Sequence, residues 1–466
     1  MSQPLLIAGG TVVTDGGRAE ADVLLRDGRV AAVGAVRDPA ATVVRADGCL
    51  VLPGAVDPHT HVFGAAHADG VAALCGGTTS ALVFVDGDPG ETPAAAAERG
   101  VREQIPESPI DLGFHGVVWE PEAYRDGDLA ALADAGVTSV KLWLAYRELG
   151  IMADDAQVHA IMAEAAREGV LVQAHCENGG AVADIAQRLR DRGTTALSEH
   201  GRARPIGLEA EAVHRLLRFA EVTGADTYVV HVSGREPLEE ILRARMRGQT
   251  VFAETCAHHL VLDDRVYAGD DALRFMMTPP LRAPADCDAL WEGLRSGAID
   301  TLASDHGHLR LDADKVPAAD DVTAVPYGIP GIQWRLALGM THGVRAGRLS
   351  LERLVEVACA APARAFGLYP RKGTLRPGAD ADLVVWDPTR TVVVGDDSRR
   401  DGLDYSPYDG MALQGPPRIV VAGGEVVAED GVFLGREAPA RFLPRPRRTA
   451  VGADLGPSGD GLAAAR

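Results

Sequence analysis

The middle of the chain, residues 53–371, alternates short apolar segments with longer segments rich in Ala, Glu and Arg. The apolar segments are TSALVFV, IDLGFHGVV, SVKLWL, LVQAH, TYVVHV, TVFAET and TLASD. Strands that alternate with helices in this way form a parallel sheet. The number of such units and the chain length of 466 residues favour an α/β fold, a closed (β/α)8 barrel of the TIM type, over an open sheet.

Both ends of the chain have a different pattern, with short strands and tight turns. In residues 1–52 the strand-like segments are separated by Asp-Gly pairs, which favour hairpin turns. A similar pattern returns in residues 372–445, at DADLVVWDP and RIVVAGGEVVAEDGVF. We therefore predict that the two ends pair into one small β-sandwich beside the barrel. Residues 446–466 are rich in Gly, Ala and Pro and are predicted to form a flexible tail.

The composition disfavours several classes of protein. Apolar residues make up 46% of the chain, which excludes global disorder, and the formal net charge of −20 argues against a nucleic-acid or anionic-membrane partner. No apolar run approaches the ~18 residues of a membrane span, and MSQPLLIAGGTVV does not resemble a signal peptide. The cysteines are scattered, which is typical of reduced thiols, and we predict a cytoplasmic protein. They are Cys49, Cys75, Cys176, Cys256, Cys287 and Cys359.

Polar side chains lie at the carboxyl ends of several predicted barrel strands, where the catalytic groups of such barrels occur. His59 and His61 are two residues apart in AVDPHTH, so they face the same side of a strand. The segments LVQAH, TYVVH and TLASD end in His175, His231 and Asp305. Any one of them alone is more often a structural residue, but imidazole and carboxylate groups gathered at one barrel mouth are typical metal ligands. The sequence therefore predicts a metal site at that mouth.

Lys141 lies inside GVTSVKLWLAY, an apolar segment that is typical of a buried strand. A buried ammonium group without a partner is energetically unfavourable. One explanation is that the lysine side chain extends from the strand end to solvent. The other is that it reacts with carbon dioxide to form a carbamate, an anion that can bridge two divalent ions. We favour the carbamate, because this strand lies between the strand of His59 and the strand of His175.

The chain resembles the amidohydrolase superfamily in motifs that span nearly its whole length. Within this superfamily it is similar to the cyclic-amide hydrolases hydantoinase and dihydropyrimidinase. Allantoinase and dihydroorotase are more distant relatives. MTPPLR and KLWLAY favour the hydantoinase branch. The motifs are LPGAVDPHTH, GGTT, SVKLWLAY, QAHCEN, RARPIGLEAEAVHRLL, YVVHVS, FAETCAHHLVLD, MTPPLR, ASDH, IPGIQWRL, FGLYPRKGTLRPGADADLVVWDP and SPYDG.

The resemblance implies a site with two divalent metal ions. Zinc is the first choice, with manganese or iron as alternatives, because mixed His and carboxylate ligands discriminate weakly between these metals. The implied ligands are His59, His61 and Asp305 for one ion, His175 and His231 for the other, and carboxylated Lys141 as a bridge between both.

The resemblance also implies catalytic and substrate-binding residues. Asp305 would take a proton from the attacking water and pass it to the ring nitrogen. Tyr146 would donate a hydrogen bond to the oxyanion, and backbone groups at Thr278 and in the loop of Tyr327 and Gly328 would bind the amide ring. The expected reaction opens the ring of a hydantoin or dihydropyrimidine to give an N-carbamoyl amino acid.

Some features depart from the hydantoinase pattern. The loop after His61, VFGAAHADGVAALCGGTT, is shorter than in that group. Tyr327 stands where the group has Asn in a Pro-Asn-Gly sequence, so substrate preference and stereochemistry stay open. Val62 and Phe63 occupy the positions of the arginine of dihydroorotases, which argues against dihydroorotate as the substrate.

Two alternative functions remain open at this point. One is allantoinase or another ring-opening cyclic amidase that uses the same site. The other is a non-enzymatic scaffold related to dihydropyrimidinase, which is disfavoured because all six metal-ligand positions are present. The family commonly forms homo-oligomers, so we expect a tetramer or dimer that binds a small cyclic amide.

Overall fold

The structure is a computed structural model that describes residues 3–448. From residue 449 onward the predicted flexible tail lies outside the described residues. The largest feature is a curved sheet with the strand order β13-β12-β11-β10-β9-β8-β7-β6-β14, in which all ladders are parallel. Its strands are β6 Ala55–His61, β7 Thr78–Val85, β8 Asp111–Val117, β9 Ser139–Trp143, β10 Leu171–His175, β11 Thr227–Val229, β12 Val251–Cys256, β13 Thr301–Ala303 and β14 His306–Gly307.

The two edge strands of this sheet, β13 and β14, are nearly consecutive in the chain, so the sheet closes on itself. Only Ser304 and Asp305 separate β13 from β14. β13 pairs with β12, whereas β14 pairs with β6 at the other edge. β6 to β12 therefore provide seven strands, and β13 with β14 completes the eighth. This closure confirms the predicted (β/α)8 barrel.

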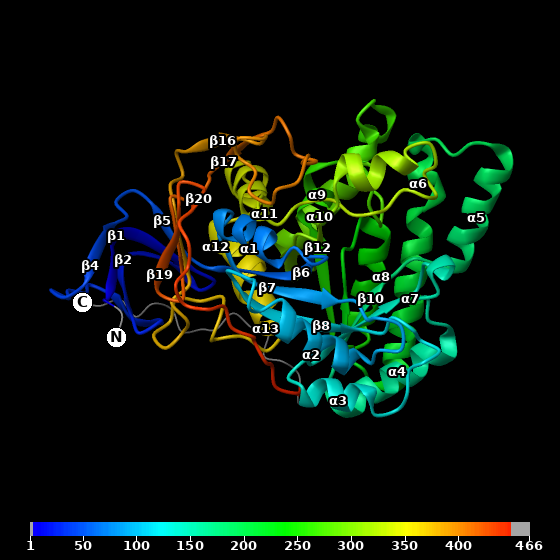
Figure 1. Ribbon diagram of the computed structural model, residues 1–466, viewed down its shortest axis with the longest axis horizontal. Helices are drawn as coiled ribbons and strands as arrows, with labels where there is room; N and C mark the ends of the chain where they lie inside the picture. The colour runs from blue at the N-terminus through cyan, green and yellow to red at the C-terminus, as the bar shows by residue number, and fades with distance from the viewer. Residues whose placement is uncertain (1–2, 449–466) are drawn as a thin grey trace.

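Helices cover the outside of the barrel (Figure 1). α4 begins with a capping box between Asp154 and Gln157 and ends at Gly169, whose left-handed backbone (φ 65°) leads the chain into β10. No helix among residues 3–448 is both long and apolar enough for a membrane span. The helices are α1 Ala66–Cys75, α2 Pro93–Glu103, α3 Asp128–Asp134, α4 Asp155–Glu168, α5 Gly179–Arg192, α6 His200–Ala203, α7 Ile206–Thr223, α8 Arg235–Met246, α9 Ala257–Val261, α10 Pro284–Ser296, α11 Arg335–Leu338, α12 Leu351–Val355 and α13 Ala361–Ala365.

Strands from both ends of the chain form a second sheet beside the barrel, as the blue and orange strands of Figure 1 show. Its order is β20-β19-β18-β15-β5-β1-β2-β3, and β4 also pairs with β1. The sheet has its own apolar core, which includes Ile7 and Val51 from one end and Leu383 and Val421 from the other. The predicted union of the two ends is confirmed, and the domain limits near residues 52 and 371 stay predictions. The strands are β1 Leu5–Thr14, β2 Gly17–Arg26, β3 Arg29–Gly34, β4 Thr42–Arg45, β5 Leu50–Pro53, β15 Leu383–Trp386, β18 Ile419–Ala422, β19 Glu425–Glu429 and β20 Val432–Phe433, and β16 Thr391–Val393 and β17 Ala412–Gln414 form a separate hairpin.

Residues 441–448 leave the small sheet and run across the amino ends of three barrel strands. The backbone N–H of Leu443 donates to the carbonyl of Leu112 at the start of β8. The N–H groups of Arg445 and Arg448 donate to the carbonyls of Gly136 and Gly169, which precede β9 and β10. This segment covers the amino end of the barrel, and the carboxyl end stays free for a site.

Candidate metal centre

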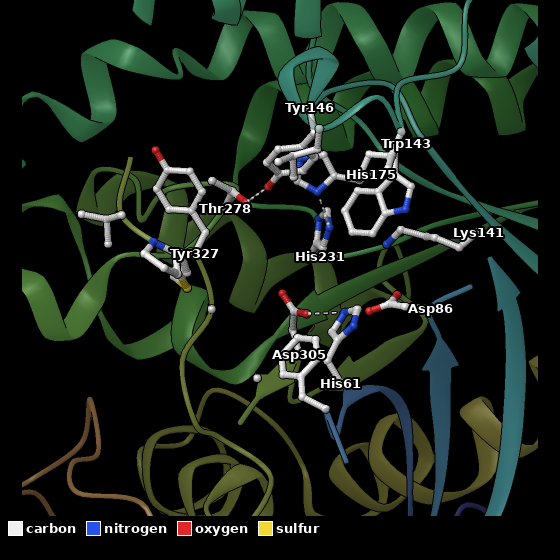
Figure 2. A pocket seen from close by; sticks show the side chains of 18 of the residues that line it. His61, Asp86, Lys141, Trp143, Tyr146, His175, His231, Thr278, Asp305 and Tyr327 are labelled. Carbon is white, nitrogen blue, oxygen red and sulfur yellow. Dashed lines mark hydrogen bonds and ion pairs between the residues drawn. The ribbon is translucent and has the colours of Figure 1, made fainter. Parts of the chain in front are cut away.

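A cavity of about 490 Å³ opens at the carboxyl ends of the barrel strands. Figure 2 shows the side chains that point into it from different strands and loops. Every residue that the sequence singled out for the site lies in the wall of this cavity. These residues are His59, His61, Lys141, Tyr146, His175, His231, Thr278, Asp305, Tyr327 and Gly328.

His59, His61 and Asp305 form one group of candidate metal ligands. Alternation along β6 puts both imidazoles on the same face, and their Nε2 atoms are 3.3 Å apart. Asp305 Oδ1 lies 3.0 Å from His59 Nε2 and 3.6 Å from His61 Nε2. One nitrogen or oxygen atom from each residue lies within 4.8 Å of the others, so the three side chains can hold one ion.

His175 and His231 form a second group. His175 ends β10, His231 follows β11, and His175 Nδ1 lies 3.0 Å from His231 Nε2. His231 and Asp305 both have positive φ angles, of 39° and 47°. Such backbone conformations are unfavourable for residues other than glycine and cluster at functional sites. Two ring nitrogens that face each other across this distance can hold a second ion.

Lys141 lies in β9 with its side chain fully buried, at 0% exposure. The alternative that the side chain extends to solvent is therefore wrong. Its Nζ atom has no hydrogen-bond partner among the described residues and lies 4.8 Å from the ring centre of Phe84 and 4.9 Å from that of Trp143. In Figure 2 the amino group points toward His231. A buried amine without a partner at this place fits a group that is converted to an anion and then binds metal.

Burial lowers the pKa of the Lys141 amine to about 8. The neutral amine is the form that reacts with carbon dioxide, so the site increases the reactive fraction of the amine near neutral pH.

The two histidines of the first group differ in pKa. Burial lowers the pKa of His59, but the charges of Asp305 and Glu254 outweigh burial and raise it to about 9. Burial holds the pKa of His61 down at about 3, so His61 keeps a free lone pair for an ion.

Glu254, in the middle of β12, orients the first group of ligands and was missed at the sequence level. Its Oε1 accepts hydrogen bonds from His59 Nδ1 at 2.6 Å and from the backbone N–H of His231 at 3.0 Å. Its Oε2 accepts from the Tyr228 hydroxyl at 2.7 Å. The carboxylate fixes the His59 tautomer with Nε2 toward the cavity and also holds the strained backbone of His231. The signal was present in FAETC, where a charged residue interrupts an apolar strand just as Lys141 does.

Replacing Glu254 with Gln should lower metal affinity by roughly 10- to 100-fold, because the acceptor that orients His59 is weakened. Titration of the metal-free protein with zinc, followed by calorimetry, measures this. Tyr228→Phe is the matched control, because it removes a single bond to the same carboxylate and should have a smaller effect. Equal zinc affinity in Glu254→Gln and the wild type would contradict the orienting role.

Glu177 orients His175 in the same way. Its Oε2 lies 2.7 Å from His175 Nε2 and accepts a hydrogen bond from Arg204 Nη1 at 2.6 Å. Burial raises the pKa of the Glu177 carboxyl, but Arg204 and His175 outweigh burial and lower it to about 2. The ionised carboxylate therefore directs His175 Nδ1 toward His231. Glu177 lies in the QAHCEN motif, two residues after a predicted ligand, although no role was predicted for it.

Among the predicted substrate-binding residues, Tyr146 lies beside the second group of ligands, with its ring centre 5.1 Å from that of His175 (Figure 2). The hydroxyl groups of Tyr146 and Thr278 form a hydrogen bond with each other. The Tyr327 hydroxyl donates to the carbonyl of Val322 at 2.5 Å, so this side chain is tied to its own loop. Gly328 has φ 136°, which residues with a Cβ rarely adopt, so glycine is required there.

Comparison with known proteins gives the family of this chain. The sequence model described as "Amidohydrolase family" matches residues 50–427, which is most of the chain. The chain belongs to the amidohydrolase family. This result confirms the predicted resemblance, and the candidate metal groups of the cavity agree with a family that implies a divalent metal site.

Individual amidohydrolases are similar to the chain over nearly its full length. It is 38% identical over 456 residues to a D-hydantoinase of Ralstonia pickettii, with 95% of this chain and 98% of the relative covered. A solved structure of a D-hydantoinase matches with a TM-score of 0.92 at 36% identity, covering 95% of this chain and 99% of that one. The dihydropyrimidinase of Brevibacillus agri matches with a TM-score of 0.91 at 33% identity, covering 96% and 99%.

Proposed function

We propose that this amidohydrolase opens the ring of a cyclic amide, a hydantoin or a dihydropyrimidine, by hydrolysis of a ring C–N bond to give an N-carbamoyl amino acid. The observation that carries the proposal is the buried, unpartnered Lys141 amine beside two groups of imidazole and carboxylate ligands at the mouth of one barrel. The similarity to hydantoinases and a dihydropyrimidinase over 95% or more of the chain supports the choice of substrate class.

We assign the ligands as the sequence predicted them. His59, His61 and Asp305 would hold one divalent ion, and His175 and His231 would hold the other. Lys141 would link the two ions after its neutral amine adds to carbon dioxide, which makes an N–C bond and releases one proton. Zinc is the proposed metal, with manganese or iron as alternatives.

The residues of the cavity then have separate roles in the reaction. When bound, the two ions would supply an activated water and would polarise the ring carbonyl. Asp305 accepts a proton from the attacking water and delivers it to the ring nitrogen as the C–N bond breaks. The Tyr146 hydroxyl donates a hydrogen bond to the oxygen that becomes negative. Backbone groups at Thr278 and in the loop of Gly328 hold the amide ring in place.

A substrate panel tests the proposal. Protein loaded with zinc in the presence of bicarbonate is assayed with 5-substituted hydantoins, dihydrouracil and allantoin, and the ring-opened products are measured by chromatography. We expect turnover of hydantoins or dihydrouracil and its loss after treatment with a chelator. Turnover of allantoin alone would move the function to allantoinase, and a metal-loaded protein that opens none of these rings would contradict the proposal.

Replacing Tyr146 with Phe should lower kcat by roughly 100-fold or more, because one donor to the developing negative charge is removed. KM should change less, since the same hydroxyl contributes little to ground-state binding. Steady-state kinetics with a hydantoin measures both constants. Tyr124→Phe is the control, because the Tyr124 hydroxyl bonds to Glu164 and lies outside the cavity wall. An unchanged kcat in Tyr146→Phe would exclude the oxyanion role.

The assembly and location of the protein stay predictions. We propose a homotetramer or homodimer, which light scattering on a sizing column would determine. A cytoplasmic location is proposed from the sequence pattern, and cell fractionation would test it.

A further inference from the structure

Asp86 is a carboxylate of the cavity wall that the proposed mechanism does not use. It directly follows β7, is partly buried and lines the cavity. Its Oδ1 atom is shielded from solvent and has no hydrogen-bond partner within residues 3–448. Figure 2 shows the carboxylate near the amino group of Lys141. A buried carboxylate oxygen without a donor is unfavourable, so a bound molecule that supplies a donor would be stabilised there.

The surroundings of Asp86 suit a positively charged group. Phe63, Trp119 and Trp143 supply aromatic rings to the same cavity, and Glu148, which is exposed, supplies a carboxylate in addition to Asp86 and Asp305. Aromatic faces and carboxylates together are the usual environment of bound ammonium and guanidinium groups. Lys141 is the one Lys or Arg among the residues that line the cavity.

The negative charge of Asp86 and the net negative charge of the whole chain both favour the binding of a cation. Burial raises the pKa of Asp86 while Lys141 and Arg99 lower it, and the result is about 6. A cationic group bound beside Asp86 would favour the ionised form of this carboxyl. If Lys141 carries a carbamate, its amine offers Asp86 no positive charge. The net charge of −20 also concentrates cations near the protein surface.

We propose that Asp86 selects cyclic amides whose ring substituent carries a positive charge, such as a hydantoin with an aminoalkyl chain on C5. The substituent extends from the ring along the wall formed by Trp119 and Trp143, and its ammonium group donates a hydrogen bond to Asp86. This inference rests on the proposed function, since it names the substrate class of the same site.

A matched pair of substrates tests the inference. In 5-pentylhydantoin a methyl group replaces the ammonium group of 5-(4-aminobutyl)hydantoin, so the two compounds differ in charge and hardly in shape. In the wild type, kcat/KM should favour the charged compound by ~10-fold or more, the size expected for a hydrogen bond between charged groups. The difference should appear mainly in KM, and should shrink as the salt concentration rises.

The variant Asp86→Asn keeps the shape of the side chain and removes its charge, so the preference should fall to a ratio near 1. Asp88→Asn is the control on the same loop, because Asp88 is exposed and does not line the cavity. A wild-type ratio near 1, or an unchanged ratio in Asp86→Asn, would overturn the inference.

Failure of the proposed function gives a different result. In that case the protein opens neither compound, and calorimetry then compares their affinities for the metal-loaded wild type and for Asp86→Asn. A preference for the charged compound that depends on Asp86 would support the binding role alone. Equal affinities would overturn it.

Discussion

Replacing Lys141 with Ala is expected to remove both metal ions and to lower kcat/KM for a hydantoin by ~1000-fold or more, since the ions supply several kcal/mol of charge stabilisation in the transition state. The side chain is completely buried and lies in the middle of a strand, so no neighbouring residue can take its place. Metal analysis by mass spectrometry and steady-state kinetics measure the two effects.

The control variants separate a carbamate from a simple buried cation. Lys141→Arg keeps a positive charge but cannot form the same carbamate, so it should lose metal and activity as Lys141→Ala does. Added acetate or propionate should partly restore the activity of Lys141→Ala, because a free carboxylate can occupy the vacated space. Lys315→Met removes another buried lysine, whose Nζ donates to the Met276 carbonyl at 2.7 Å, and should keep its metal. Full metal content in Lys141→Ala would contradict the bridging role.

Replacing Asp305 with Asn should lower kcat by ~1000-fold, within the range for loss of a general acid–base group. The amide keeps the shape of the side chain but cannot accept and return the proton. We expect the variant to retain metal at the histidine pair of His175 and His231. The readouts are kcat with a hydantoin substrate and metal content per chain.

Asp300→Asn is the matched control for this prediction. Asp300 lies just before β13 at the far end of the same strand, where its Oδ2 pairs with Arg245 Nη2 at 2.5 Å. Its loss should affect thermal stability and leave kcat close to that of the wild type. If Asp305→Asn turned over substrate at the wild-type rate, a different residue would have to move the proton.

The barrel and the positions of the five strand-end ligands could be predicted because both follow from regular patterns, whereas Tyr146, Thr278, Tyr327 and Gly328 were predicted from the family resemblance alone. The alternation of strands and helices gives a parallel barrel, and a polar residue that ends an apolar strand must then lie at the common mouth. His175 and His231 illustrate this, since each ends an apolar segment and the two imidazoles come within 3.0 Å. Their roles in catalysis are proposals that the variants above test.

The remaining features depend on contacts between distant parts of the chain. Glu254 can be recognised as a charged residue in an apolar strand, but its partners His59 and Tyr228 lie on other strands, and no spacing in the sequence connects them. Asp86 lies in a loop, where periodicity gives no direction for the side chain. The segment 441–448 crosses the amino ends of the barrel through backbone hydrogen bonds and through arginine side chains, whose partners, such as Asp111 for Arg441 and Asp226 for Arg448, lie far away in the sequence.

The closure of the barrel at Asp305 has a consequence for how the protein unfolds. The carboxylate sits at the gap between β13 and β14, where the last strand meets β6, and its nearest neighbours are the two imidazoles of β6. An ion shared by these three side chains would cross-link β6 to the segment between β13 and β14, where the barrel closes. Enzyme stripped of metal should therefore open first at this closure on heating and become sensitive to proteases there.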